Sequence, residues 1–288
     1  MRIRVDEPLL AWLPLTLRGV AAFARVSLRR VLIAQLIFAA VVAAAFALLI
    51  ETTWFATIRE TIATLPANGQ IQHGQLEWPE PVPADLAGGR FLKFSIDPAH
   101  SGELGQESDM AIELGQTNIW IISLLGYLEA PYPPGWSVAL NRAELEPWWG
   151  AREPFLVLGA GGAMGLLLLV IWWTLGLVYA VIAWVLALLA NRSLGLAGAW
   201  KLAGTAQLPG ALLLAASFLS YRLGWLSLLH LVLSVGLSFA VAWFYVLCTP
   251  FLLPPAENTG AAKANPFLTP SGPTAEKTQP KKNPFTRR

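Results

Sequence analysis

The chain has 288 residues, of which 55% are apolar and only 13% are charged, and its formal net charge is +2. A typical soluble domain has about 25% charged residues, so this composition excludes an ordinary soluble protein. Long uncharged segments instead predict an α-helical integral membrane protein whose first partner is the lipid bilayer. Neither a nucleic-acid partner nor a cofactor is expected.

The first 30 residues carry six arginines and two acidic residues. Arg18, Arg25 and Arg29 share one face of a helical wheel, so residues 1–30 are interpreted as a cytoplasmic basic amphipathic segment. Such a segment either lies on an anionic inner leaflet or is a solvated cluster that sets the topology. Residues 31–50 lack any ionisable group and can cross about 30 Å of hydrocarbon as transmembrane helix 1. This apolar run is too long for a cleaved signal peptide.

Residues 51–153 carry fourteen acidic and five basic residues. Since Lys and Arg near membrane ends stay inside, this insert is expected outside, as a small extracytoplasmic α+β domain. Residues 54–65 are predicted to continue the first helix, and His73-Gly74 to form a tight hairpin turn. The single cysteine, Cys248, lies in the last apolar run, so no disulfide is available to this domain. Alternating apolar residues predict strands over residues 92–96 and 110–114, and a richer apolar run over residues 118–125 indicates a further strand.

Residues 154–253 are predicted to form a transmembrane helical bundle. As one helix, residues 154–190 would be about 55 Å long, more than one upright crossing needs. Either this helix projects beyond the bilayer, which gives four spans, or it turns near residues 174–176, which gives five. The basic tail favours four spans, with the N-terminus and the C-terminus both cytoplasmic.

Within this region, residues 155–170 read FLVLGAGGAMGLLLLV, which superficially resembles a dinucleotide-binding turn. The third glycine of a G-x-G-x-x-G pattern is replaced by Met164, and no acidic residue follows about twenty positions later. Glycines four residues apart in an apolar helix instead favour close helix packing. The predicted helix-packing residues are Gly159, Gly161, Gly162 and Gly165.

His230 is the one ionisable residue in a predicted span, and such residues are functional candidates by default. A polar tip bonded to Ser227 or Ser234 is the alternative to a proton relay. A transport function would require a polar cavity lined by Gln35, Ser217, Ser234 or His230.

Catalytic groups are sparse. Asp97, His100 and His73 could form a metal or hydrolase site only if the fold brings them together, and they fall short of a ligand set. Glu144 and Glu146 could pair as carboxylates, but solvated charge before the membrane is the usual explanation for such residues. No H-E-x-x-H or G-x-S-x-G motif is present. The chain is therefore interpreted as non-enzymatic.

Residues 254–288 are rich in Pro, Lys, Thr and Ala, which predicts a disordered cytoplasmic tail. The tail contains the tripeptide Asn-Pro-Phe twice, and Asn-Pro favours a turn that would present the Phe. The repeat is either a docking motif for a partner or a coincidence of biased composition. Its residues are Asn265, Pro266, Phe267, Asn283, Pro284 and Phe285.

Three short motifs carry a family resemblance. They are Asn68-Gly69-x-Ile71-x-His73-Gly74-x-Leu76, Phe94-x-Ile96-Asp97, and Lys201-Leu202-Ala203 leading to Leu208-Pro209. Over residues 20–250 this order resembles an uncharacterised bacterial membrane-protein family, some of whose members are described as maltodextrin-utilisation proteins. The layout is also loosely similar to that of Yip-type membrane proteins. The resemblance implies one helix, an outer β-containing insert and a helical bundle, and it implies no catalytic residue.

These observations predict a non-enzymatic scaffold, accessory or sensing protein of the bacterial inner membrane. Its partner would be another protein or further copies of itself. One alternative is an accessory component of membrane transport, most plausibly carbohydrate uptake. A second alternative is an extracytoplasmic enzyme.

Overall fold

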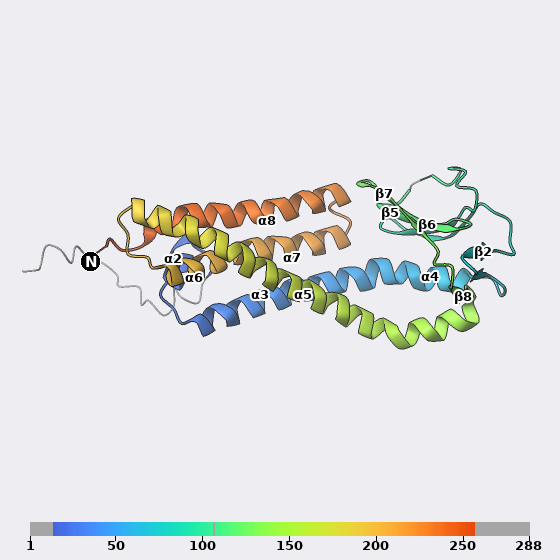
Figure 1. Ribbon diagram of the computed structural model, residues 1–288, viewed down its shortest axis with the longest axis horizontal. Helices are drawn as coiled ribbons and strands as arrows, with labels where there is room; N and C mark the ends of the chain where they lie inside the picture. Colours follow the sequence, from blue (N-terminus) through green and yellow to red (C-terminus); the bar gives the residue numbers. More distant parts are fainter. Residues whose placement is uncertain (1–13, 106, 257–288) are drawn as a thin grey trace, which may run out of the picture.

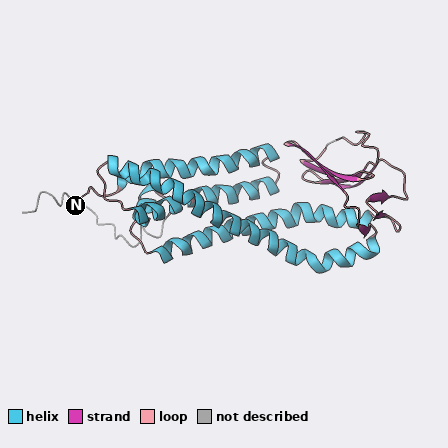
Figure 2. Cartoon of the chain, viewed as in Figure 1, coloured by secondary structure: helices cyan, strands magenta, loops and turns pink. Residues whose placement is uncertain are grey.

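Four helical stretches in the described part of the chain are long and apolar enough to cross a membrane. The computed structural model describes residues 14–105 and 107–256. Figures 1 and 2 show an elongated helical bundle with two small β-sheets at one end. The four stretches are Leu28–Thr64, Arg142–Leu189, Leu196–Arg222 and Leu228–Leu252.

The first stretch is one continuous helical path. Helix α3 covers Leu28–Ile50, a π-helical turn, η1, covers Glu51–Phe55, and α4 covers Ala56–Thr64. The predicted helical continuation over residues 54–65 is therefore confirmed. Short π-helical turns inside long helices are frequent at functional sites, so η1 marks a position of interest.

The second stretch is a single helix, α5, over Arg142–Leu189. It has 48 residues, and at about 1.5 Å per residue it is much longer than a bilayer is thick. The predicted alternative of two short spans turning near residues 174–176 is therefore wrong. The helix also begins well before residue 154, where the sequence placed its start. The Asn141 side chain caps the helix by accepting a hydrogen bond from the Glu144 N–H (2.9 Å).

The third and fourth stretches complete the bundle. Helices α6, Leu196–Ala206, and α7, Leu208–Arg222, are separated at Gln207, and α7 has a proline in its first turn. Helix α8 covers Leu228–Cys248 and continues into a 3₁₀ turn, η2, over Thr249–Leu252. In Figure 1, α7 and α8 run side by side.

Small residues allow α3 and α5 to approach closely. A Cβ added to Gly161 would lie 3.2 Å from the Ala47 Cβ and 3.3 Å from the Ala43 carbonyl oxygen. A Cβ on Gly165 would lie 3.4 Å from the Ala43 Cβ. Such approach of small residues is a usual source of helix association in lipid.

The other two glycines of this run lie elsewhere on α5. A Cβ added to Gly159 or Gly162 would have no heavy atom within 4 Å. The predicted packing face is therefore narrower than the glycine run, because neighbouring helical positions point about 100° apart and only every third or fourth residue shares a face.

One buried amide ties three helices together. Gln35 of α3 is only 1% exposed. Its Nε2 donates to the Gly204 carbonyl of α6 (3.4 Å), and its Oε1 accepts from the Trp173 indole N–H of α5 (3.1 Å). The amide is satisfied within the bundle, as a buried polar group requires.

The described part of the N-terminal segment forms a short helix, α2, over Leu17–Phe23. Its apolar face is packed into the bundle, where Val20 and Ala21 belong to the same core cluster as residues of α5, α6 and α8. Arg18 and Arg25 remain exposed. The helix ends before α3 begins, so the amphipathic segment is not one helix through residue 30.

The β-containing part between α4 and α5, called here the β domain, has two sheets. The three-stranded sheet has the order β2-β1-β8 and the five-stranded sheet has the order β3-β4-β5-β6-β7. All neighbours are antiparallel except β4 and β5, which are parallel. The strands are β1 Gln70–Gln72, β2 Gln75–Glu77, β3 Ala84–Gly88, β4 Lys93–Ile96, β5 Met110–Leu114, β6 Asn118–Ser123, β7 Gly126–Pro131 and β8 Ser137–Ala139.

Several sequence predictions for the β domain are confirmed. His73 and Gly74 connect β1 to β2 with positive φ angles of 49° and 77°, and β4, β5 and β6 lie within the predicted ranges.

The core of the β domain contains Ile71, Ile96 and Tyr132. Burial raises the pKa of the Tyr132 phenol to about 12, and its hydroxyl donates to the Gly115 carbonyl (3.0 Å).

The two described ends of the chain lie at the same end of the bundle, opposite the β domain (Figure 1). The segment after α8 pairs with the turn between α5 and α6. Arg192 donates to the Leu253 carbonyl (2.7 Å), and the Ala256 N–H donates to the Asn191 carbonyl (2.9 Å). Helix α2 also contacts η2, so the two described ends meet at one level.

Candidate functional site

The polar residues that the sequence singled out in the β domain have structural roles. The Asp97 carboxylate is 1% exposed and accepts hydrogen bonds from the Ser101 N–H (2.6 Å) and hydroxyl (2.8 Å). This arrangement begins the crossover from β4 to the parallel strand β5. Burial on its own raises the pKa of this carboxyl, but the hydrogen bonds from the Ser101 hydroxyl and from backbone N–H groups bring the pKa below 3.8.

His73 and His100, the two histidines of the predicted metal or hydrolase site, lie in different parts of the β domain. His100 is hydrogen-bonded to the buried Glu113 carboxylate and stacked on Trp120, with ring centroids 4.4 Å apart. His73 lies in the turn of the β1–β2 hairpin, in the other sheet. Within residues 14–105 and 107–256, no three His, Cys, Asp or Glu side chains are placed to share a metal ion.

Glu144 and Glu146 lie in the first turns of α5. The Glu146 carboxylate accepts a hydrogen bond from the Arg142 Nε (3.0 Å), and both side chains of this pair are more than half exposed. The arrangement is a surface ion pair at a helix start, and such pairs contribute little to stability.

His230 lies in the first turn of α8, exposed at the end of the bundle nearer the β domain. Its Nδ1 is 2.7 Å from the Ser227 hydroxyl, and this same hydroxyl caps α8 by accepting from the His230 N–H. Ser234 donates to the His230 carbonyl (3.0 Å). These contacts are local to one helix end and form no chain of polar groups through the bundle.

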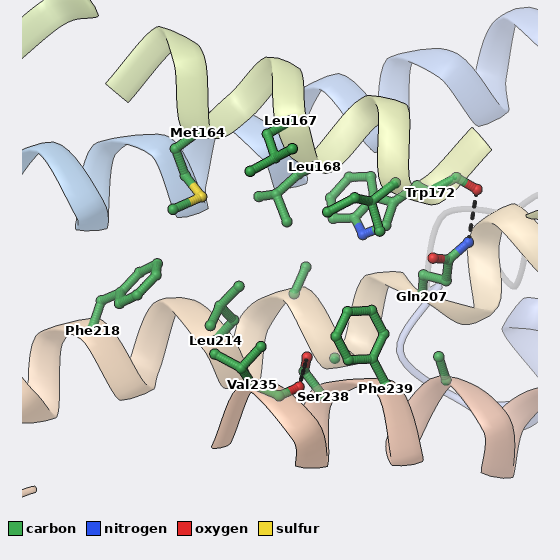
Figure 3. Close-up of a pocket in the computed structure, with 14 residues that line it drawn as sticks. Met164, Leu167, Leu168, Trp172, Gln207, Leu214, Phe218, Val235, Ser238 and Phe239 are labelled. Atoms are coloured by element: carbon green, nitrogen blue, oxygen red, sulfur yellow. Dashed lines mark hydrogen bonds between the residues drawn. The ribbon is translucent and has the colours of Figure 1, made fainter. Parts of the chain in front are cut away.

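A cavity of about 180 Å³ lies between α5, α7 and α8 (Figure 3). Figure 3 shows Met164, Leu168 and Trp172 on one wall, with Leu214 and Phe218 facing them from α7. The remaining wall comes from α8, and Gln207 closes one end by donating to the Trp172 carbonyl (2.9 Å). The lining is almost entirely apolar. A cavity of roughly 150 Å³ with such a lining stays dry and accepts small apolar molecules.

The geometry of α5 and α8 explains this cavity. Tyr179 of α5 meets Trp243 of α8 with ring centroids 5.1 Å apart, at the end of the bundle away from the β domain. Toward the β domain the two helices diverge, as Figure 1 shows. None of Gln35, Ser217, Ser234 and His230, the residues proposed for a polar transport cavity, lines this space. Ser217 instead donates to the Leu213 carbonyl of its own helix (2.8 Å).

Polar and aromatic side chains connect the β domain to the bundle. Arg90, in the turn between β3 and β4, donates to the Gly224 carbonyl and to the Leu226 carbonyl (2.7 Å). Both carbonyls belong to the connection between α7 and α8. Gly224 has a φ of 79°, and a Cβ there would lie 2.7 Å from an Arg90 guanidinium nitrogen. The position therefore favours glycine for its backbone conformation, and a larger residue would also make the Arg90 guanidinium shift.

Aromatic and acidic groups extend this contact. The Phe91 ring meets Tyr221 of α7 edge-to-face, with centroids 4.9 Å apart. The Tyr221 hydroxyl donates to the Asp109 carboxylate (2.9 Å). The Asp109 N–H in turn donates to the Arg90 carbonyl (2.8 Å). We call the contact formed by Arg90, Phe91, Asp109, Tyr221, Gly224 and Leu226 the junction.

The π-helical turn η1 lies beside the junction. The Arg222 Nε, one residue after Tyr221, donates to the Thr52 hydroxyl in η1 (2.8 Å). Phe55, the last residue of η1, packs edge-to-face on Trp149 of α5 with centroids 5.0 Å apart. Residues of η1 therefore contact α7 at the end of the junction and contact α5 one turn further on.

No local sequence pattern links the residues of the junction. Arg90 lies 134 positions from Gly224, and Asp109 lies 112 positions from Tyr221. The one usable local signal is Gly224, since glycine commonly follows the last residue of a helix.

The repeated tripeptide of the tail, Asn265 to Phe267 and Asn283 to Phe285, lies outside the described residues.

Comparison with known proteins adds no further constraint. No family model matches the chain, and no curated protein and no solved structure is significantly similar to it.

Proposed function

We propose that this chain is a non-enzymatic protein of the bacterial inner membrane that acts as a scaffold, accessory or sensing subunit. Its β domain faces outward, and both of its ends are cytoplasmic. The four long apolar helices and the acidic composition of residues 51–153 support this placement, because basic segments stay inside.

The observation that carries the proposal is the junction. A flexible tether would leave the β domain free to tumble. Here Arg90 of the β domain donates to the α7–α8 connection, and Tyr221 of α7 donates to Asp109 of the β domain. A partner or ligand bound outside would therefore act directly on α7 and α8. The π-helical turn η1 beside the junction gives the first helix an irregular turn at the same level.

Accessory transport of carbohydrate is the weaker proposal. A sugar needs hydrogen-bonding groups along its path, and the cavity between α5, α7 and α8 is lined by side chains such as Leu168, Leu214 and Phe218. This lining suits hydrocarbon. The resemblance to the family with maltodextrin-utilisation members gives no residue-level support for sugar binding.

The scaffold proposal is tested by reversible crosslinking in native membranes followed by isolation of the full-length protein in mild detergent. A scaffold predicts a stoichiometric partner or a defined homo-oligomer. The double variant Phe267→Ala with Phe285→Ala is expected to weaken this association by removing both aromatic anchors of the tail repeat. The variant Thr269→Ala with Thr274→Ala, in the same tail, is the matched control and should change nothing.

The scaffold role and the tail as its docking element are contradicted by different results. Isolation of a monomer with no stoichiometric crosslinked partner would contradict the scaffold role. A partner retained equally by both double variants would leave the scaffold role intact and remove the tail as its docking element.

A further inference from the structure

The hairpin between β6 and β7 exposes large apolar side chains. Leu124 and Leu125 form its turn and are 64% and 65% exposed, and Tyr127 and Leu128 follow with 72% and 61% exposure. We call these four residues the hairpin tip. Turns of this kind usually carry Gly, Asn, Asp or Ser, because those residues suit the backbone and are hydrated. A contiguous exposed apolar patch marks an interaction surface.

The strand register places the hairpin tip at one defined end of the five-stranded sheet. Ser123 pairs with Met110 of β5 on one side and with Gly126 of β7 on the other. Met110 directly follows Asp109, which accepts the hydrogen bond from Tyr221. The tip and the junction therefore belong to the same end of the sheet. Figure 1 shows this end of the sheet directed toward the bundle.

The bundle at this level has the features of a membrane boundary. The connection between α7 and α8 exposes Leu223 and Trp225, and α8 then begins with exposed Leu229. Trp at the end of an apolar helix favours the headgroup region. Arg222 is the last residue of α7, so the surface changes from charged to apolar within the few residues that follow it. The hairpin tip belongs to the sheet end that is attached at this boundary.

We propose that the hairpin tip inserts into the outer leaflet of the bilayer that surrounds the bundle. Leu124 and Leu125 would contact acyl chains, and Tyr127 would lie among the headgroups, where its hydroxyl stays hydrated. No charged residue interrupts the chain from Ser123 to Leu128. The β domain is thereby held at two points, through protein at the junction and through lipid at the hairpin tip.

The shape of the tip favours lipid over a protein partner. A two-residue turn is a narrow convex point, whereas protein partners usually bury broad surfaces of several hundred Å² on each side. Strand β7 is an edge strand, so pairing with a second copy is the competing occupant. This inference rests on the membrane placement in the proposed function, and the experiment below separates the two.

The test uses the full-length protein with Cys248→Ser as background, so that each added cysteine is the single labelling site. Leu124→Cys reports on the hairpin tip. Gln116→Cys, in the exposed turn at the opposite end of the same sheet, is the matched control. Leu237→Cys, exposed near the middle of α8, reports on the bundle. Each variant is labelled with an environment-sensitive fluorophore and reconstituted into vesicles of phosphatidylethanolamine and phosphatidylglycerol.

Quenching is measured with lipids that carry a nitroxide either near the headgroup or near the end of the acyl chain. The label at Leu124 is expected to lose most emission with the shallow nitroxide, as for groups about 5–10 Å deep in the boundary region. The label at Leu237 should lose most emission with the deep nitroxide. The label at Gln116 should lose none with either. Leu125→Cys repeats the tip measurement at the neighbouring position.

Each contrary result has a separate meaning. If the labels at Leu124 and Leu125 are not quenched, like the label at Gln116, while the label at Leu237 is quenched, tip insertion is overturned and the membrane placement stands. If Leu237 is not quenched, the placement in the proposed function fails. If the emission of the tip label changes with the density of protein in the vesicles and is not quenched by either nitroxide, the tip binds a second copy instead. This result also overturns the inference.

Discussion

At the scale of single residues, Gly161 and Gly162 show how strongly the packing of a glycine depends on its position around the helix. They are adjacent in the sequence, yet only Gly161 faces α3. We expect Gly161→Leu to destabilise the bundle by about 1–3 kcal/mol, because the added side chain must displace Ala43 or Ala47. The measurement is the thermal unfolding temperature in mild detergent, together with the amount of protein that accumulates in membranes.

Gly162→Leu is the matched control for this prediction. A Cβ added there has no heavy atom within 4 Å, so the effect should stay within about 0.5 kcal/mol. Equal unfolding temperatures for the two variants would show that α3 and α5 do not pack as described.

Asp97 supplies the pH-dependent prediction at this scale. Its pKa is lower in the folded protein than the ordinary value of 3.8, so it stabilises the fold at neutral pH. This contribution is lost as the pH falls from 3.8 through the lower folded pKa. Asp97→Asn should therefore speed hydrogen exchange over residues 97–102 at neutral pH, and the difference from the unmodified protein should shrink below pH 3.8.

Glu103→Gln, exposed in the same crossover, is the control and should leave this exchange unchanged. A difference between Asp97→Asn and the unmodified protein that persists undiminished in acid would contradict the role given to the carboxylate.

At the scale of elements, the sequence predicted what local patterns determine. The positive φ that glycine tolerates identified the His73-Gly74 turn, alternation identified β4 and β5, and a continuous apolar run identified β6. The length of uncharged runs identified the apolar helices. These signals depend on neighbours within a few residues, so no knowledge of the fold was needed to read them.

Features that depend on distant contacts could not be read in this way. The choice between one helix and two spans over residues 154–190 depends on where α5 begins, and Asn141 sets that start upstream of two prolines. The junction pairs Arg90 with Gly224 and Asp109 with Tyr221, which no local pattern links. The extent of the glycine packing face also depends on the direction from which α3 approaches.

The junction itself leads to a prediction about coupling between elements. Tyr221→Phe removes the hydrogen bond to Asp109 but keeps the ring against Phe91, at a net cost of about 0.5–1.5 kcal/mol. We expect faster hydrogen exchange over residues 88–92 and 109–110, with no change over residues 70–77 in the other sheet. Hydrogen exchange with mass spectrometry on the full chain measures both regions.

Tyr127→Phe removes the hydroxyl of an exposed tyrosine and is the control for this comparison. If it changed residues 88–92 as much as Tyr221→Phe does, the junction would not be the specific attachment of the β domain.

At the scale of the whole molecule, the described ends meet beside the turn between α5 and α6, and the β domain lies at the other end of the bundle (Figure 1). A chain that crosses a membrane an even number of times has both of its ends on the same side, and the described ends lie together in this way. This arrangement agrees with the charge bias of the sequence, in which the segments at both ends are basic and the β-containing insert is acidic. Four apolar helical stretches are long enough to span a membrane, and we propose that the chain crosses it four times with the β domain outside.

Labelling of single cysteines in intact bacterial cells tests this claim most directly. In the Cys248→Ser background, a membrane-impermeant maleimide should label Gln116→Cys in intact cells. It should label Leu196→Cys, and a cysteine added after residue 288, only once the inner membrane is permeabilised. Labelling of the added C-terminal cysteine in intact cells, or protection of Gln116→Cys until permeabilisation, would contradict the account.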